Sequence, residues 1–246
     1  MAETLSENHI CEQEVLYFSR VLSGQCHEMA NALNIARELC GLHEDIFPRA
    51  REGHADAVEK LGSLAHRMQT QIDRCHAIVR TLGHFAHSAD GTRLGCDVRE
   101  IVERALFFAA RQVRLRQAEL QAVVPAGDVQ LVECNPFLLQ QAIHAGTELL
   151  LEGIGQSRRI TVGLTPETAG AVVTLASADP FVCNDAAPAL LAEITATVQA
   201  AGGELRETPE SGGGLKFFIP YCRRGLTSAD SELGIPKGTG GGCDVS

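Results

Sequence analysis

Two stretches with helical periodicity, separated by a short polar segment, constrain this fold more than any other feature of the sequence. In each, apolar residues recur mostly at steps of three and four, the spacing of one face of an α-helix. The segment Gly41–Gly53 between them contains Pro48 and several charges, so it predicts a hairpin loop. The two apolar stripes comprise Val15, Phe18, Leu22, Met29, Leu33, Ala36 and Cys40, and then Leu61, Leu64, Met68, Ile72, Cys75, Val79, Leu82 and Phe85.

Each stripe is narrow, close to the heptad type, so a single hairpin cannot bury both stripes fully. Two hairpins can do so by packing as an up-and-down four-helix bundle. We therefore expect residues 11–90 to form a dimerisation hairpin and the protein to be a homodimer. The alternative is an intramolecular hairpin that docks on the C-terminal domain of its own chain.

Residues 95–222 alternate predicted helices with pairs of short strands, in the order αββαββαββ. Pro136 stands where a first-turn proline belongs, and Thr165-Pro166 predicts a turn between two paired strands. This order predicts an α+β sandwich, with helices on one face of a mixed sheet. Residues 223–246 lack periodicity and predict a disordered tail. The expected helices cover about 97–117, 136–152 and 187–200, and the expected strands 120–124, 129–134, 159–164, 170–177, 204–207 and 215–219.

Charge and composition narrow the class of partner. The net charge of −10 disfavours nucleic acid, and Arg111, Arg114 and Arg116 are interpreted as one solvated helix face. No run approaches the ~20 apolar residues of a membrane span, and only about ten residues precede the first helix. Nine cysteines without a CxxC pair indicate reduced thiols. We expect a cytoplasmic protein without a membrane segment.

His27 differs from the other eight histidines in its placement. A lone histidine on a helix is more often a surface residue than a catalyst, but Leu22, Met29 and Leu33 are expected in the bundle seam. His27 is then directed to solvent, where a large partner can reach it. Glu28 follows it, and Asn31 lies one turn on, where side chains meet on a helix face. A carboxylate can hold the second ring nitrogen of an imidazole, and an amide can orient a water.

The segment Cys26-His27-Glu28-Met29-Ala30-Asn31-Ala32-Leu33-Asn34 resembles the H-box of histidine kinases, in which His-Glu is followed by Asn or Thr four residues after the histidine. It departs from that motif at Ala32, where many members carry proline. The resemblance implies that His27 is the phosphoacceptor, that Glu28 is the acid/base carboxylate, and that Asn31 orients water.

The second block is similar to the ATP-binding domain of the same family. Thr197–Pro220 resembles its closing helix, Gly-Gly, strand, glycine turn and strand, and Asn135–Ile143 resembles the start of its N-box helix. Together with the hairpin, the likeness covers about residues 15–222. It implies a histidine-kinase-type α/β sandwich that follows a dimeric four-helix bundle.

The nucleotide-binding residues of that family do not carry over. Leu149 falls where the family's magnesium-holding asparagine belongs, and Ala145 falls at the preceding one. Asp179 lies where the family has the aspartate of an Asp-x-Gly-x-Gly motif, which binds the adenine amine, but the two glycines are absent. An aspartate at the end of a strand usually forms a turn. Fewer than ten residues separate Asp179 from the helix at Ala187, so the ATP lid and its second glycine motif are missing. We expect a degenerate domain with no cofactor.

These expectations favour a phosphorelay protein. His27 would accept a phosphoryl group from a response-regulator receiver domain and pass it to another, without ATP of its own. Two alternatives stay open. One is a divergent ATP-dependent histidine kinase that uses ATP and magnesium. The other is a non-catalytic response-regulator-binding protein or phosphatase, in which Asn31 matters.

Overall fold

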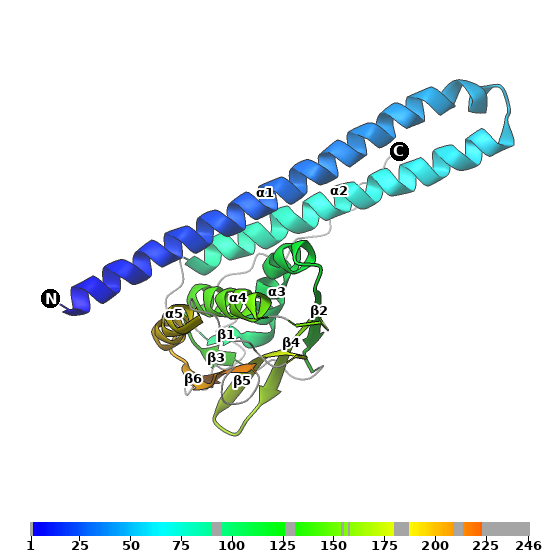
Figure 1. Cartoon of the computed structure of the whole chain (residues 1–246). Coiled ribbons are helices and arrows are strands. Elements are labelled where there is room, and N and C mark those ends of the chain that lie inside the picture. The colour runs from blue at the N-terminus through cyan, green and yellow to red at the C-terminus, as the bar shows by residue number, and fades with distance from the viewer. Residues whose placement is uncertain are drawn as a thin grey trace.

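A helical hairpin and an α/β sandwich make up this chain (Figure 1). The computed structural model describes residues 2–89, 95–125, 131–153, 155–156, 158–179, 187–208 and 214–222. The hairpin-plus-sandwich class predicted from the sequence is confirmed. The predicted tail at 223–246 and the glycine turn before 214 lie outside the described residues.

The hairpin consists of α1 (Ala2–Arg51) and α2 (Ala55–Ala89), which run antiparallel along each other. The 50 residues of α1 span roughly 75 Å at ~1.5 Å per residue. Gly53 has a φ of +90°, a conformation that glycine adopts without a steric cost. Its N–H donates to the carbonyl of Ala50 (3.0 Å) and so helps to end α1.

The predicted loop at Gly41–Gly53 is wrong, because α1 continues through Gly41 and Pro48 as far as Arg51. A glycine inside a helix costs only about 1 kcal/mol, and packing along α2 outweighs that cost. Leu39 is buried near the end of α1. Ala57 is buried at the start of α2 because α1 runs opposite it.

The sandwich is built on a five-stranded mixed sheet with the order β2-β4-β5-β7-β6. β2 and β4 are parallel, and the other neighbours are antiparallel. A separate two-stranded ladder pairs β1 with β3. The bounds are β1 (Gly95–Asp97), α3 (Val98–Leu115), β2 (Glu119–Val123), β3 (Leu131–Glu133), α4 (Pro136–Glu152), β4 (Arg159–Pro166), β5 (Gly170–Ser177), α5 (Ala187–Ala200), β6 (Glu204–Glu207) and β7 (Gly214–Pro220).

Local signals place most of these elements. Asn135 caps α4, accepting hydrogen bonds from the N–H groups of Phe137 and Leu138, and Pro136 follows at the first helical position. The predicted turn at Thr165-Pro166 is wrong by a few residues. Both residues pair with β5, and the turn lies beyond them, closed by the Glu167 N–H on the carbonyl of Gly170 (2.8 Å).

The core of the sandwich lies between the sheet and the helices α3, α4 and α5. Close approach of α4 to the sheet depends on Gly146, where a Cβ would lie 2.9 Å from Leu215 and 3.2 Å from Leu175. The buried residues that line this interface from the two sides are Ile101, Leu139, Ile143, Leu150, Ile194 and Val198, and Ile160, Val162, Val173, Leu175, Leu215, Phe217 and Ile219.

The sandwich packs against the hairpin at the end opposite the turn (Figure 1). Phe85 of α2 is 1% exposed and contacts four aromatic rings, those of Tyr17, Phe18, Phe108 and Phe137. The ring centroids are 5.0 to 5.6 Å apart, within the range of favourable aromatic pairs. The hairpin is therefore docked on its own C-terminal domain.

Phe85→Ala should lower the free energy of unfolding by about 3–5 kcal/mol, because it empties the centre of this aromatic cluster. Phe107→Ala is the matched control, since the Phe107 ring is 37% exposed, and should cost less than about 1 kcal/mol. Urea unfolding of both variants measures the difference. Equal losses would contradict the central place of Phe85 in the docking interface.

Candidate functional site

His27 and Asn31 lie on an exposed face of α1, one helical turn apart. Successive helix residues are rotated by about 100°, so His27 points about 120–140° away from Leu22 and Leu33. The predicted exposure of His27 is therefore confirmed. The predicted seam belongs to a dimeric bundle; in the single chain Leu22 and Leu33 are exposed, so the seam stays a prediction.

The residues of α1 that pack within the chain form a different stripe. Tyr17, Val21, Gln25, Ala32 and Leu39 are buried. Their spacing of four and seven places them on one side of α1, between the stripe of Leu22 and the face of His27. Glu28, the residue next to His27, also faces inward: its side chain is only 14% exposed.

Glu28 is surrounded by guanidinium groups. Its Oε2 accepts a hydrogen bond from Arg74 of α2 and lies 3.3 Å from Nη2 of Arg114 of α3. Its Oε1 lies 3.6 Å from Nε of Arg111. Glu28 is thus turned toward α2 and α3, while His27 is turned to solvent. The interpretation of Arg111 and Arg114 as a merely solvated face missed this cluster.

The positions that match the family's nucleotide site have other surroundings. Leu149 is 1% exposed and belongs to the sandwich core. The backbone N–H of Asp179 donates to Oγ of Ser177 (3.3 Å), a local bond of the kind that shapes turns. Residues 180–186, which follow Asp179, lie outside the described residues.

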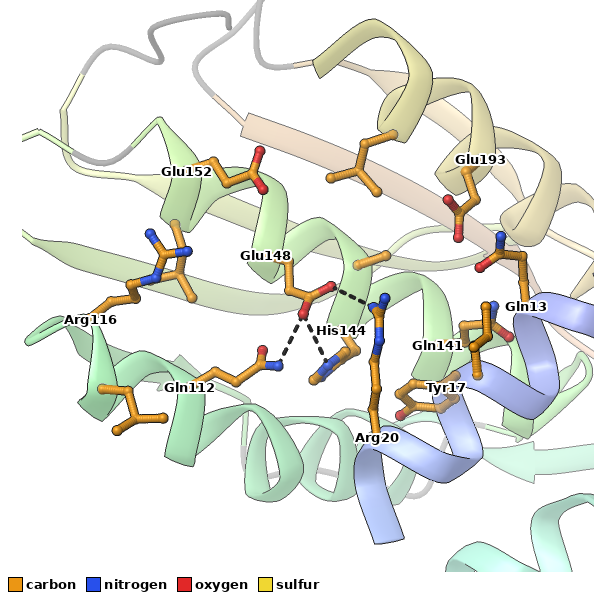
Figure 2. Close-up of a pocket in the computed structure, with 15 residues that line it drawn as sticks. Gln13, Tyr17, Arg20, Gln112, Arg116, Gln141, His144, Glu148, Glu152 and Glu193 are labelled. Atoms are coloured by element: carbon orange, nitrogen blue, oxygen red, sulfur yellow. Dashed lines mark hydrogen bonds and ion pairs between the residues drawn. The ribbon is translucent and has the colours of Figure 1, made fainter. Parts of the chain in front are cut away.

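A cleft of about 520 Å³ separates the start of α1 from α3, α4 and α5. Figure 2 shows Glu148 of α4 at its centre, with Arg20 of α1 and Gln112 of α3 directed toward it. Gln112 donates to Glu148 Oε1 (3.0 Å), Arg20 lies 3.5 Å from Oε2, and His144 Nε2 lies 3.7 Å from Oε1. This polar cluster links three helices.

Tyr17 and His144 form the buried wall of this cleft. Their ring centroids are 5.3 Å apart, and the Tyr17 hydroxyl and both His144 nitrogens lack a hydrogen-bond partner among the residues that the structure describes. Burial, reinforced by the Glu148 carboxylate, raises the pKa of Tyr17. Burial lowers the pKa of His144, against the opposing effect of Glu148. His144 is therefore neutral at pH 7.

The sequence analysis did not predict this cluster. The available signal was the placement of His144 and Glu148 four residues apart in a mostly apolar helix. That spacing identifies one polar face of α4. It does not reveal that Tyr17 and Arg20, more than 120 positions away in the sequence, complete the cluster.

His144 should make stability pH-dependent. Its folded pKa lies below the unfolded value of about 6.5, so the unfolded chain binds a proton that the folded chain does not. The free energy of unfolding should therefore fall as the pH drops below about 6.5. One such group contributes at most about 1.4 kcal/mol per pH unit. Urea unfolding from pH 5 to 8 should show a shallower fall for His144→Gln; parallel curves would contradict this assignment.

No metal-binding arrangement of three or more His, Cys, Asp or Glu side chains occurs in the described part of the chain. None of the helices described here combines the length and the apolar character needed to cross a bilayer.

Comparison with known proteins found similarity at the level of structure. No family model and no curated protein matches this sequence. One similar structure is the Acinetobacter baumannii histidine kinase AdeS, at 16% identity and a TM-score of 0.40, over 75% of this chain and 95% of that one. Another is the mycobacterial sensor histidine kinase MprB, at 18% identity and a TM-score of 0.42, over 53% and 98%. A third is the cytoplasmic segment of the histidine kinase QseC, at 13% identity and a TM-score of 0.39, over 61% and 94%.

Proposed function

We propose that this protein is a dimeric histidine phosphotransfer protein of two-component signalling. In this proposal His27 accepts a phosphoryl group from a response-regulator receiver domain and passes it to another, and the sandwich domain binds no ATP. Glu28 is the acid/base carboxylate, and Asn31 orients water in the hydrolytic reaction.

The observation that carries the proposal is the position of His27. It lies in the H-box-like segment, on a face of α1 that neither α2 nor the sandwich covers. A folded receiver domain needs such an open, convex surface to bring its aspartate to an imidazole nitrogen. A histidine buried in the hairpin seam could not meet this requirement.

The residues of the sandwich support phosphotransfer over kinase activity. A magnesium ion prefers hard oxygen ligands, and the side chain of Leu149 offers none and is enclosed in the core. The aligned Ala145 also lacks an oxygen on its side chain. A protein that receives its phosphoryl group from an acyl phosphate on a partner does not need this site.

The uncovered apolar stripe of the hairpin supports a homodimer. Val15, Leu22 and Leu33 on α1 are exposed together with Ile72 and Val79 on α2. Apolar side chains repeated along one side of a long hairpin are the pattern that a second copy buries in a four-helix bundle. His27 points away from this stripe, so dimerisation would leave it open to a receiver.

A response-regulator phosphatase is the second candidate, favoured by the exposed amide of Asn31 one turn from His27. In that case the protein would release phosphate from a receiver without accumulating phosphohistidine. Asn31→Ala would then abolish the release of phosphate, while His27→Ala would leave it in place.

The phosphotransfer proposal predicts that purified protein takes up label from a ³²P-phosphorylated receiver domain, whereas radiolabelled ATP with magnesium gives no label. His27→Ala should abolish the uptake and keep the dimer. His76→Ala is the matched control, because His76 is an exposed histidine of α2, and it should label like the wild type. Label from ATP on the wild type alone would establish a kinase instead.

Leu33→Glu should convert the dimer to a monomer, because it places a charge within the apolar stripe, where Leu33 is 55% exposed in the single chain. Asn34→Glu, on another exposed face of the same turn, should leave the dimer intact. Light scattering coupled to gel filtration gives the mass of each variant. A monomeric wild type would contradict the dimer.

A further inference from the structure

Three guanidinium groups converge on one carboxylate beside the proposed phosphoacceptor. Arg74 comes from α2, and Arg111 and Arg114 come from α3; all three form ion pairs with Glu28. We refer to these three arginines as the arginine triad.

The charges of the arginine triad are not balanced by Glu28. Arginine remains protonated at every physiological pH, so three positive charges face one negative charge. The excess of about two positive charges stands out in a chain whose net charge is −10. Each guanidinium carries five N–H donors, so the triad offers more donors than the two oxygens of Glu28 can accept, and a further anion could use the remainder.

The triad also borders a hollow. A space of about 120 Å³ is lined by Glu28 and the triad, together with Gln25 and Phe107. This is several times the ~30 Å³ that one water molecule occupies, so it leaves room for a tetrahedral anion. Arg74 and Arg114 are 42% and 60% exposed, which leaves their side chains free to reorient toward the neighbouring position.

We propose that the arginine triad is an anion site that holds the phosphoryl group in transit between His27 and the receiver aspartate. This inference rests on the proposed function. Glu28 occupies the triad in the resting protein, and the three phosphoryl oxygens replace it when the group arrives. Guanidinium groups form strong, charge-assisted pairs with phosphate oxygens.

The transfer balances without another reactant. The lone pair of one imidazole nitrogen of His27 forms the N–P bond while the O–P bond of the receiver's acyl phosphate breaks. The receiver carboxylate leaves with that electron pair, and the proton on the second ring nitrogen passes to Glu28, the proposed acid/base carboxylate, once the phosphoryl group has displaced it from the triad. The triad offsets the negative charge on the three equatorial phosphoryl oxygens during this in-line displacement.

A merely structural role for the cluster makes a different prediction from an anion site. If the ion pairs only join α1, α2 and α3, Glu28→Gln and Arg114→Gln should both lower stability and should leave anion binding unchanged. If the triad binds phosphate, the two substitutions act in opposite directions. Glu28→Gln removes the competing carboxylate, while Arg114→Gln removes a ligand.

The first experiment is therefore a titration of the full-length protein with inorganic phosphate, in which the NMR signals of the His27 ring report binding. Arg114→Gln and Arg74→Gln should weaken binding roughly tenfold, the loss expected for one charge-assisted hydrogen bond. Glu28→Gln should tighten it. Arg67→Gln, an exposed arginine of α2 outside the triad, is the matched control and should bind like the wild type. Equal affinities across all variants would overturn the anion site.

The second experiment separates this inference from the proposed function. Phosphoramidate, a small phosphoryl donor for histidine, and a phosphorylated receiver are each offered to the wild type, Arg114→Gln and Arg67→Gln, with thermal unfolding as a check of the fold. A wild type that takes no label from either donor would refute the proposed function. If the wild type takes label, a labelling rate of Arg114→Gln roughly tenfold below that of Arg67→Gln supports the anion site. Equal labelling rates in the two variants would refute it.

Discussion

The packing of Phe85 against rings from α1, α3 and α4 is the contact on which the rest of the structure depends. It joins a long hairpin, which has little core of its own, to a sandwich with a complete core. Aromatic rings suit this interface because each buries a large apolar area and adds a directional ring contact. With this contact in place, the cleft at Glu148 and the pairing of Glu28 with α3 follow from the same docked arrangement.

Helix α1 carries three different surfaces around its axis. One packs on α2 and the sandwich through Tyr17, Val21 and Ala32, a second is the apolar stripe of Leu22 and Leu33, and the third presents His27. The rotation of about 100° per residue keeps these surfaces apart over many turns. The proposed dimer partner and the proposed receiver domain would therefore contact different side chains of the same helix.

Helix α3 connects the two polar clusters of the molecule. Its Gln112 reaches Glu148 in the cleft, and its Arg111 and Arg114 reach Glu28 beside the proposed phosphoacceptor. A shift of the sandwich along the hairpin would change both sets of contacts at once. The burial of neutral His144 between these elements adds a pH-sensitive contribution to the same interface.

The sequence by itself determined the two long helices, the αβ order of the second block from α3 onward and the exposure of His27, but it missed β1 (Gly95–Asp97). The correct predictions follow from local rules, namely apolar spacing, a proline at the first turn of α4 and the rotation of residues about a helix. It misplaced the hairpin turn, because α1 continues through Gly41, which costs only about 1 kcal/mol, and through Pro48, which costs about 3 kcal/mol but lies in the last turn of the helix. Periodicity also did not show that α1 carries a second stripe, that of Tyr17, Val21 and Ala32, which packs within the chain.

Only the tertiary structure decided which distant residues meet. Glu28 and Arg114 are separated by 86 positions, and Arg20 and Glu148 by still more, so no local pattern links them. The docking of the sandwich brings α3 and α4 against the first half of α1, and it buries the aromatic rings of Tyr17 and Phe85 between the two parts. That docking adds Arg111 and Arg114 of α3 to Arg74 of α2 around the carboxylate of Glu28, next to His27 in the sequence.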